Sequence, residues 1–113
     1  MSQFAFVYRS APPASLSPQQ MQERMQRWQA WFKDVEKRGH LAHYGYPLEP
    51  KGGGVVKDKN GSVTDGPYAE TKDIILGFSI IEASDFEQAV ALAKTHPIYE
   101  QGGIIEVRPV RKM

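Results

Sequence analysis

The segment K-D-I-I-L-G-F-S-I-I-E, residues 72–82, predicts the long central β-strand of the fold. It is rich in β-branched and aromatic residues, which favour strands. Successive side chains of a strand point to opposite faces, so its residues divide into two sets. One set is Ile74, Leu76, Phe78 and Ile80, and the other is Ile75, Gly77, Ser79 and Ile81. Both sets contain apolar residues, which indicates a strand that is at least partly covered on both faces.

The N-terminal part of the chain predicts a strand followed by a helix. Phe4, Phe6 and Tyr8 alternate with smaller or polar residues, which predicts a first strand. Ser17-Pro18-Gln19-Gln20 has the form of a capping box, so we expect a helix to start at Ser17. Gly39 stands where a left-handed C-terminal cap is expected. The apolar stripe of this helix, interpreted as core, consists of Met21, Met25, Trp28, Phe32 and Val35.

Four further elements complete the order. Residues 41–45 predict a second strand, and Asn60-Gly61 between two short extended runs predicts a type I′ hairpin. Ser84-Asp85-Phe86-Glu87 predicts a second capping box, which opens a helix that Pro97 stops. Residues 104–110 predict the last strand.

The order β-α-β-hairpin-β-α-β predicts an α+β fold of the ferredoxin-like, split βαβ type, as one domain over residues 1–113. Two helices would lie on one face of a four-stranded antiparallel sheet. If the set Ile74, Leu76, Phe78 and Ile80 packs under the helices, Ile75 and Ile81 point to a face that this chain does not cover. Uncovered apolar residues favour a partner, so we expect a homodimer formed through the sheet faces.

Composition excludes several classes of function. The 113 residues carry a formal net charge of +1 with interspersed charges, which argues against a nucleic-acid partner or a membrane surface. The chain has no cysteine, so it has no disulfide, thiol nucleophile or thiolate metal site. We expect no metal site at His40 and His43, since these two side chains point to opposite faces if they lie in a strand. We also expect no cofactor. Without an export signal or a long apolar run, the expected location is cytoplasmic.

The candidate catalytic residues are Asp65 and His96. In the predicted topology Arg9, Asp65, His96 and Ile104 share one edge of the sheet. Asp65 in D-G-P either opens a turn or holds a carboxylate that orients a histidine. His96, just past a helix end, either caps the last carbonyls or carries a proton.

Charged residues near this edge are candidate ligand-binding groups with equally plain structural readings. Glu70 and Lys72 are two apart, as are Glu106 and Arg108, and each pair shares a strand face. Each pair is either a salt bridge or part of a site for an anionic ligand. Gly52-Gly53-Gly54 lacks the frame of a phosphate loop and is interpreted as a flexible connection.

Several motifs together resemble the YCII-related proteins of the DGPF group. They are V-T-D-G-P-Y-A-E-T-K-D, I-L-G-F-S-I-I-E-A-S, F-E-Q-A-V-A-L-A-K-T-H-P and G-G-I-I-E-V-R-P-V, between residues 63 and 110. The resemblance implies a dimeric α+β barrel with a cleft near the sheet, in which Asp65 and His96 match the proposed acid and histidine. Glu70, Lys72, Glu106 and Arg108 match further motif positions. This chain has D-G-P-Y where the group has D-G-P-F, which adds a hydroxyl at Tyr68, and relatives vary at the position of His96.

Three functions remain as hypotheses. The first is a homodimer that binds a polar or anionic small molecule and performs cofactor-independent elimination or isomerisation. Asp65 and His96 would transfer the proton there, and Arg9, Tyr68, Glu70, Lys72 and Arg108 would bind the ligand. The second is a non-catalytic ligand-sensing or regulatory module, which the resemblance connects with sigma-factor control. The third is a structural dimer whose motif only builds the interface.

Overall fold

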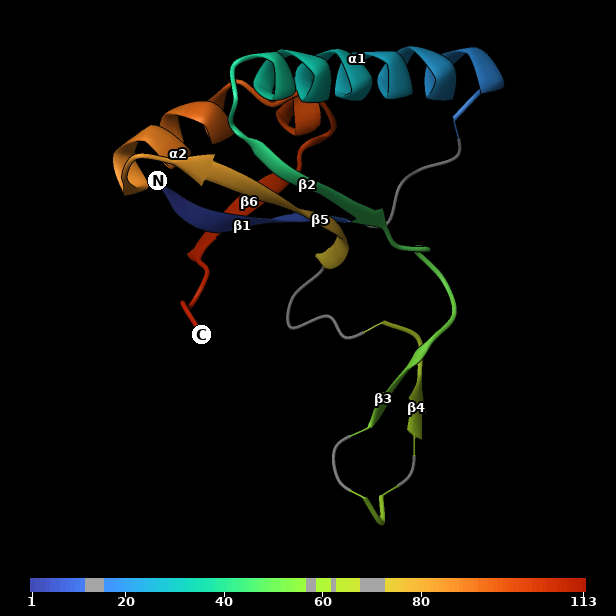
Figure 1. The fold of residues 1–113 in the computed structure, drawn as a ribbon. Helices are drawn as coiled ribbons and strands as arrows, with labels where there is room; N and C mark the ends of the chain where they lie inside the picture. The colour runs from blue at the N-terminus through green and yellow to red at the C-terminus, as the bar shows by residue number, and fades with distance from the viewer. Residues whose placement is uncertain (12–15, 57–58, 62, 68–72) are drawn as a thin grey trace.

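The computed structural model describes residues 1–11, 16–56, 59–61, 63–67 and 73–113. Four strands, β1 (Ser2–Ser10), β2 (Leu41–Pro47), β5 (Ile74–Ala83) and β6 (Ile104–Pro109), form an antiparallel sheet in the order β2-β5-β1-β6. The helices α1 (Pro18–Lys37) and α2 (Phe86–Lys94) lie together on one face of it (Figure 1). This arrangement confirms the predicted α+β, ferredoxin-like fold.

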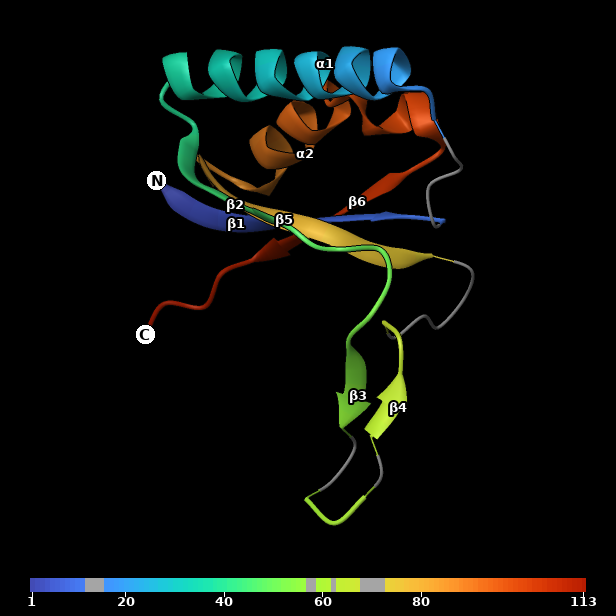
Figure 2. The same cartoon turned by 90° about the vertical axis from the view of Figure 1, so that its right-hand side faces the viewer.

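A separate hairpin projects from the opposite face of the sheet, which we call the open face. Its strands are β3 (Gly54–Val56) and β4 (Val63–Asp65), paired antiparallel. Figures 1 and 2 both show the hairpin pointing away from the helices. The hairpin itself was predicted, but the type I′ turn was wrong, because neither Asn60 nor Gly61 has the positive φ that this turn requires.

The start of α1 follows the sequence prediction. Ser17 Oγ accepts a hydrogen bond from the Gln20 N–H at 3.1 Å, and the Gln20 side chain accepts from the Ser17 N–H at 3.0 Å. These two bonds satisfy N–H groups that have no partner within the helix. At the other end Gly39 follows the cap residue with a φ of 80°, as expected.

The predicted apolar stripe of α1 is core only along its C-terminal half. Val35 is fully buried there, and Trp28 and Phe32 pack against the core. Met21 and Met25 are 55% and 59% exposed, so interpreting them as core was wrong. The physical reason is that the first turns of α1 border a cleft rather than a packed layer, as described below.

The prediction of which β5 residues face the helices was wrong after Leu76. Leu76 packs against the core and Ile75 is exposed, as expected, but Ile81 is fully buried and Phe78 is 37% exposed. The register explains the exchange: Arg9 pairs with Ile75 and Tyr8 with Gly77, which leaves Leu76 as an extra residue. Such a bulge shifts the alternation by one residue and exchanges the two faces beyond it.

The second helix starts one residue later than its predicted capping box. Asp85 is the N-cap, and its side chain accepts from the Gln88 N–H at 2.8 Å. The Gln88 side chain in turn accepts from the Ser84 N–H at 2.7 Å. The helix ends at Lys94, and Pro97 opens a short 3-10 helix, η1 (Pro97–Gln101). Pro97 therefore stops α2 as predicted, because proline has no N–H to continue the ladder.

The core lies between the sheet and the helices. Phe4, Phe6 and Tyr8 of β1 supply three of its aromatic residues, and Ile98 of η1 closes one end. Within the residues that the structure describes, no helix combines the length and the apolar character needed to cross a membrane.

Candidate functional site

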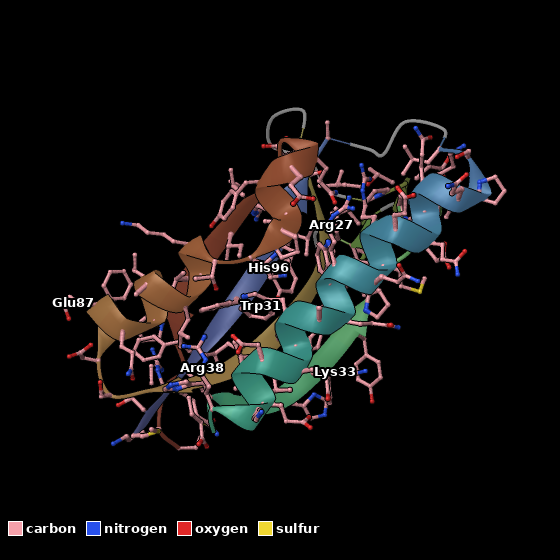
Figure 3. The ribbon with its side chains drawn as sticks, turned by 90° about the horizontal axis from the view of Figure 1, so that it is seen from above. Arg27, Trp31, Lys33, Arg38, Glu87 and His96 are labelled. Atoms are coloured by element: carbon pink, nitrogen blue, oxygen red, sulfur yellow. The ribbon has the colours of Figure 1, made fainter. Side chains whose placement is uncertain are left out.

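His96 lies inside the molecule, between α1 and the segment that follows α2. Figure 3 shows it beside Trp31, between α1 and the segment that follows α2. Only 3% of its surface is exposed. It is the N-cap of η1, and its Nδ1 atom accepts a hydrogen bond from the Ile98 N–H at 2.9 Å. An acceptor Nδ1 carries no proton, so the neutral ring of His96 has its proton on Nε2.

The surroundings of His96 keep it neutral. Its ring centroid lies 4.3 Å from that of Trp28, 4.5 Å from that of Trp31 and 4.9 Å from that of Tyr8. Nε2 is buried and has no hydrogen-bond partner among the described residues. Burial lowers the pKa of His96 to about 3, because the charged form would lose its hydration without gaining a counter-charge. Near neutral pH the residue therefore acts as a cap and as part of an aromatic cluster.

Asp65 is not beside His96 within one protomer. It is the last residue of β4, is exposed, and belongs to the hairpin on the open face of the sheet. His96 lies on the helix face (Figure 3). The prediction that Asp65 and His96 share an edge was therefore wrong for a single protomer, since the hairpin carries Asp65 away from the sheet.

Arg9, Glu106 and Arg108 do meet, on the open face of the sheet. Arg9 Nε lies 3.3 Å from Glu106 Oε1, and Arg108 Nη1 lies 3.5 Å from Glu106 Oε2. Arg9 also pairs with Ile104 in the β1–β6 ladder, so these two share an edge as predicted. The cluster has two cations for one carboxylate. Tyr68, Glu70 and Lys72 lie outside the described residues.

A cleft of about 560 Å³ lies between the N-terminal half of α1 and the sheet. We call it the α1 cleft. Trp28 and Phe32 line it from the helix, and Tyr44 and Tyr46 from β2. Tyr8 and Ser79 are buried and form its floor, where the Tyr8 hydroxyl donates to Ser79 Oγ at 2.9 Å. The other lining residues are Leu16, Met21, Arg24, Met25, Gln29, Gly45, Pro47, Leu76, Gly77, Phe78 and Gln101.

The polar groups of the floor are joined in one chain. Ser79 Oγ accepts from Tyr8 and donates to the Tyr44 carbonyl at 2.8 Å. Burial raises the pKa of Tyr8 well above its ordinary value, so the phenol stays protonated. The Tyr44 hydroxyl donates to Glu36 of α1, which is not among the lining residues, and this hydrogen bond raises the pKa of Tyr44. The bond ties β2 to the helix.

Arg24 supplies the positive charge of the cleft. It is half-buried and makes no ion pair with any residue that the structure describes, whereas Arg27 and Arg38 of the same helix pair with Glu100 and Asp34. Among the described residues that line the cleft there is no aspartate, glutamate, lysine or histidine. Across the described parts of the chain, no cluster of three or more histidine and acidic residues could hold a metal ion.

The YCII-related domain matches this sequence over residues 3–113. The chain belongs to the YCII-related family. That match confirms the resemblance drawn from the motifs between residues 63 and 110, whereas the finer assignment to the DGPF group stays a prediction. A comparison with curated proteins found no match.

One solved structure similar to this YCII-related protein is 5-chloro-2-hydroxyhydroquinone dehydrochlorinase (TftG) from Burkholderia phenoliruptrix AC1100, in complex with 2,5-dihydroxybenzoquinone. The alignment covers 97% of this chain and 93% of that chain, with 19% sequence identity and a TM-score of 0.45.

The α1 cleft of this YCII-related protein was missed by sequence reasoning. One available signal was Arg24, which precedes Trp28 by four residues and therefore lies on the same face of the helix. Met21 and Met25 gave a second signal, since they continue the apolar stripe beyond the length that the core covers. The sequence held no signal for the sheet side of the cleft, because the position of its residues depends on how β2 pairs with β5.

Proposed function

We propose that this YCII-related protein is a homodimer that binds a small molecule in the α1 cleft of each protomer. The observation that carries the proposal is the cleft itself. Its volume of about 560 Å³ lies within the range of about 300–1,000 Å³ that is typical of small-molecule sites. Its lining is mainly apolar and aromatic with a few polar groups, which is also typical of such sites.

Binding without turnover is the function that this geometry supports best. Acid–base catalysis needs a group that changes protonation near the working pH. Tyr8 stays protonated and His96, behind the cleft wall, stays neutral. The described lining residues include no carboxylate that could serve instead. This favours the ligand-sensing or regulatory hypothesis over elimination or isomerisation by Asp65 and His96.

The homodimer is proposed from the open face of the sheet. Val7 pairs with Phe78 there, and Ala5 with Ile80, so apolar side chains continue across two central strands. Phe78 is 37% exposed and Ile75 is also exposed. A second copy stacked on this face would cover these residues, and it would also bring a second Arg9–Glu106–Arg108 cluster to the interface.

The cleft is tested with a panel of small aromatic and aliphatic metabolites, screened by thermal shift and confirmed by isothermal titration calorimetry. A compound that occupies the cleft should stabilise the native state in proportion to its concentration. Met25→Tyr places a ring in the cleft and should weaken binding of such a compound at least tenfold. The matched control is Gln26→Tyr, because Gln26 is the exposed neighbour that does not line the cleft.

Two results would overturn this proposal. One is that every confirmed compound binds Met25→Tyr as tightly as it binds Gln26→Tyr, which would place the ligand elsewhere. The other is that no compound of the panel binds at millimolar concentration.

A further inference from the structure

We infer that the ligand of the α1 cleft is a flat, mainly apolar monoanion, such as an aromatic carboxylate, with its charge on Arg24 and its ring against the aromatic side chains of the helix and β2. This inference rests on the proposed binding function and names the class of molecule that the site would take. Three features of the cleft carry it: its aromatic residues, the cation that Arg24 supplies and the direction of the hydrogen bonds at its floor.

The aromatic residues of the cleft come from both of its sides. Trp28 and Phe32 are on α1, whereas Tyr44 and Tyr46 are on the edge strand β2. The rings of Phe32 and Tyr44 contact each other, with their centroids 5.4 Å apart, so a ligand would lie against these two rings and not between them. Aromatic faces at both sides favour a flat ligand that makes stacked or edge-to-face contacts.

Arg24 is suited to hold an anionic group. It faces the cleft from the turn before Trp28, and it is half-buried without an ion pair among the described residues. A guanidinium group presents a planar fork of donors that matches a carboxylate. Among the lining residues that the structure describes, none is acidic, so an anionic ligand would contact no carboxylate of this lining.

The hydrogen bonds at the floor indicate how the ligand is oriented in the cleft. The Tyr8 hydroxyl hydrogen goes to Ser79, and the Ser79 hydroxyl hydrogen goes to the Tyr44 carbonyl. These two groups therefore have no hydrogen left to donate to an anion, although the Tyr8 oxygen can still accept. Gln29 and Gln101, whose amides are neutral, also line the cleft. The anionic group consequently belongs at Arg24, and the apolar body lies toward the floor.

The test compares 2-naphthoate with 2-naphthamide, a neutral molecule of nearly the same shape. Quenching of tryptophan fluorescence follows binding, since Trp28 lines the cleft. A charge-assisted hydrogen bond to Arg24 should make 2-naphthoate bind about tenfold tighter or more than 2-naphthamide. Arg24→Gln should reduce 2-naphthoate to the affinity of 2-naphthamide. Arg27→Gln is the matched control and should leave both affinities unchanged, because Arg27 pairs with Glu100 and does not line the cleft.

Including Met25→Tyr separates failure of this inference from failure of the binding function. If Met25→Tyr weakens both probes but 2-naphthamide binds wild-type protein as tightly as 2-naphthoate, the site exists and its preference for anions is refuted. Equal loss of 2-naphthoate affinity in Arg24→Gln and Arg27→Gln would also refute the role of Arg24. If neither probe binds at its solubility limit, the aromatic acid is the wrong class, and the metabolite panel alone decides whether the cleft binds a ligand.

Discussion

The backbone N–H of Ile98 donates a hydrogen bond to Nδ1 of His96 at 2.9 Å, deep inside the protein. This bond requires the unprotonated Nδ1 atom, so folding and the neutral state of His96 are linked. In the unfolded chain the same imidazole has a pKa near 6.5, whereas in the folded protein it is about 3.

The first prediction is that His96 makes the protein acid-sensitive. Between pH 6.5 and pH 3 the unfolded chain binds more protons than the native state, so the free energy of unfolding falls as the pH is lowered. The contribution is fully present above pH 6.5 and falls by up to about 1.4 kcal/mol per pH unit below it. His96→Asn keeps an acceptor at the cap of η1 and should make the dependence shallower in urea unfolding at several pH values.

His43→Gln is the control for this prediction. His43 is exposed, and its Nδ1 accepts a hydrogen bond from the Gly45 N–H at the surface. The variant should retain the pH dependence of the wild type. A His96→Asn variant with the same pH dependence as the wild type would show that the cause lies in other groups.

The second prediction concerns the hydrogen-bond chain at the cleft floor. Ser79→Ala removes the acceptor of the buried Tyr8 hydroxyl and the donor to the Tyr44 carbonyl. Leaving buried polar groups unpaired should cost about 1–3 kcal/mol. Tyr8→Phe should cost less, because Ser79 keeps its bond to Tyr44. In a double-mutant cycle by urea unfolding, Tyr8→Phe should add little to Ser79→Ala, and full additivity would contradict the coupling.

The third prediction concerns Gly45, where β2 approaches β5. A Cβ atom at this position would lie 1.7 Å from the Phe78 carbonyl oxygen, and φ is +72°. Gly45→Ala should therefore destabilise the protein by roughly 2–5 kcal/mol through steric overlap and left-handed strain together. Gly39→Ala is the control, since it has a φ of +80° but nothing within 4 Å. Gly39→Ala should lower the free energy of unfolding by only roughly 1–2 kcal/mol. If both variants lose the same free energy in chemical unfolding, β2 moves away from Phe78 without cost and the prediction is wrong.

The fourth prediction concerns the proposed homodimer. Ile80→Lys places a charge on the open face of the sheet, which should dissociate the dimer into monomers of 12.7 kDa. Light scattering after size exclusion at micromolar concentration measures this mass directly. Gln26→Lys on the exposed side of α1 should stay dimeric. A monomeric wild-type protein under these conditions would refute the dimer.

Local sequence patterns predicted the elements of this fold well. The capping box at Ser17, the start of α1 and the stop of α2 before Pro97 depend on residues a few positions apart. The pairing of Arg108 with Glu106 on one strand face followed in the same way from alternation. These features were predictable because the groups that interact are close in sequence.

The site was less predictable, because its parts meet through long-range pairing. Tyr8 and Ser79 are 71 residues apart, and Trp31 donates to Thr95 at 2.8 Å from 64 residues away. The β5 bulge at Leu76 arises from pairing with β1 and exchanged the faces assigned to Phe78 and Ile81. Asp65 left the expected site because the hairpin turns away from the sheet, which no short-range pattern indicated.

The amino-acid sequence by itself determined the order of strands and helices, their caps and the family, because each of these depends on neighbouring residues or on motifs in a fixed order. Tertiary structure alone decided that His96 is buried and neutral, that Met21, Met25 and Arg24 border a cleft, and that Asp65 lies on the other side of the sheet. The physical reason is that burial, and with it the pKa and the shape of a cavity, is a property of which distant surfaces pack together.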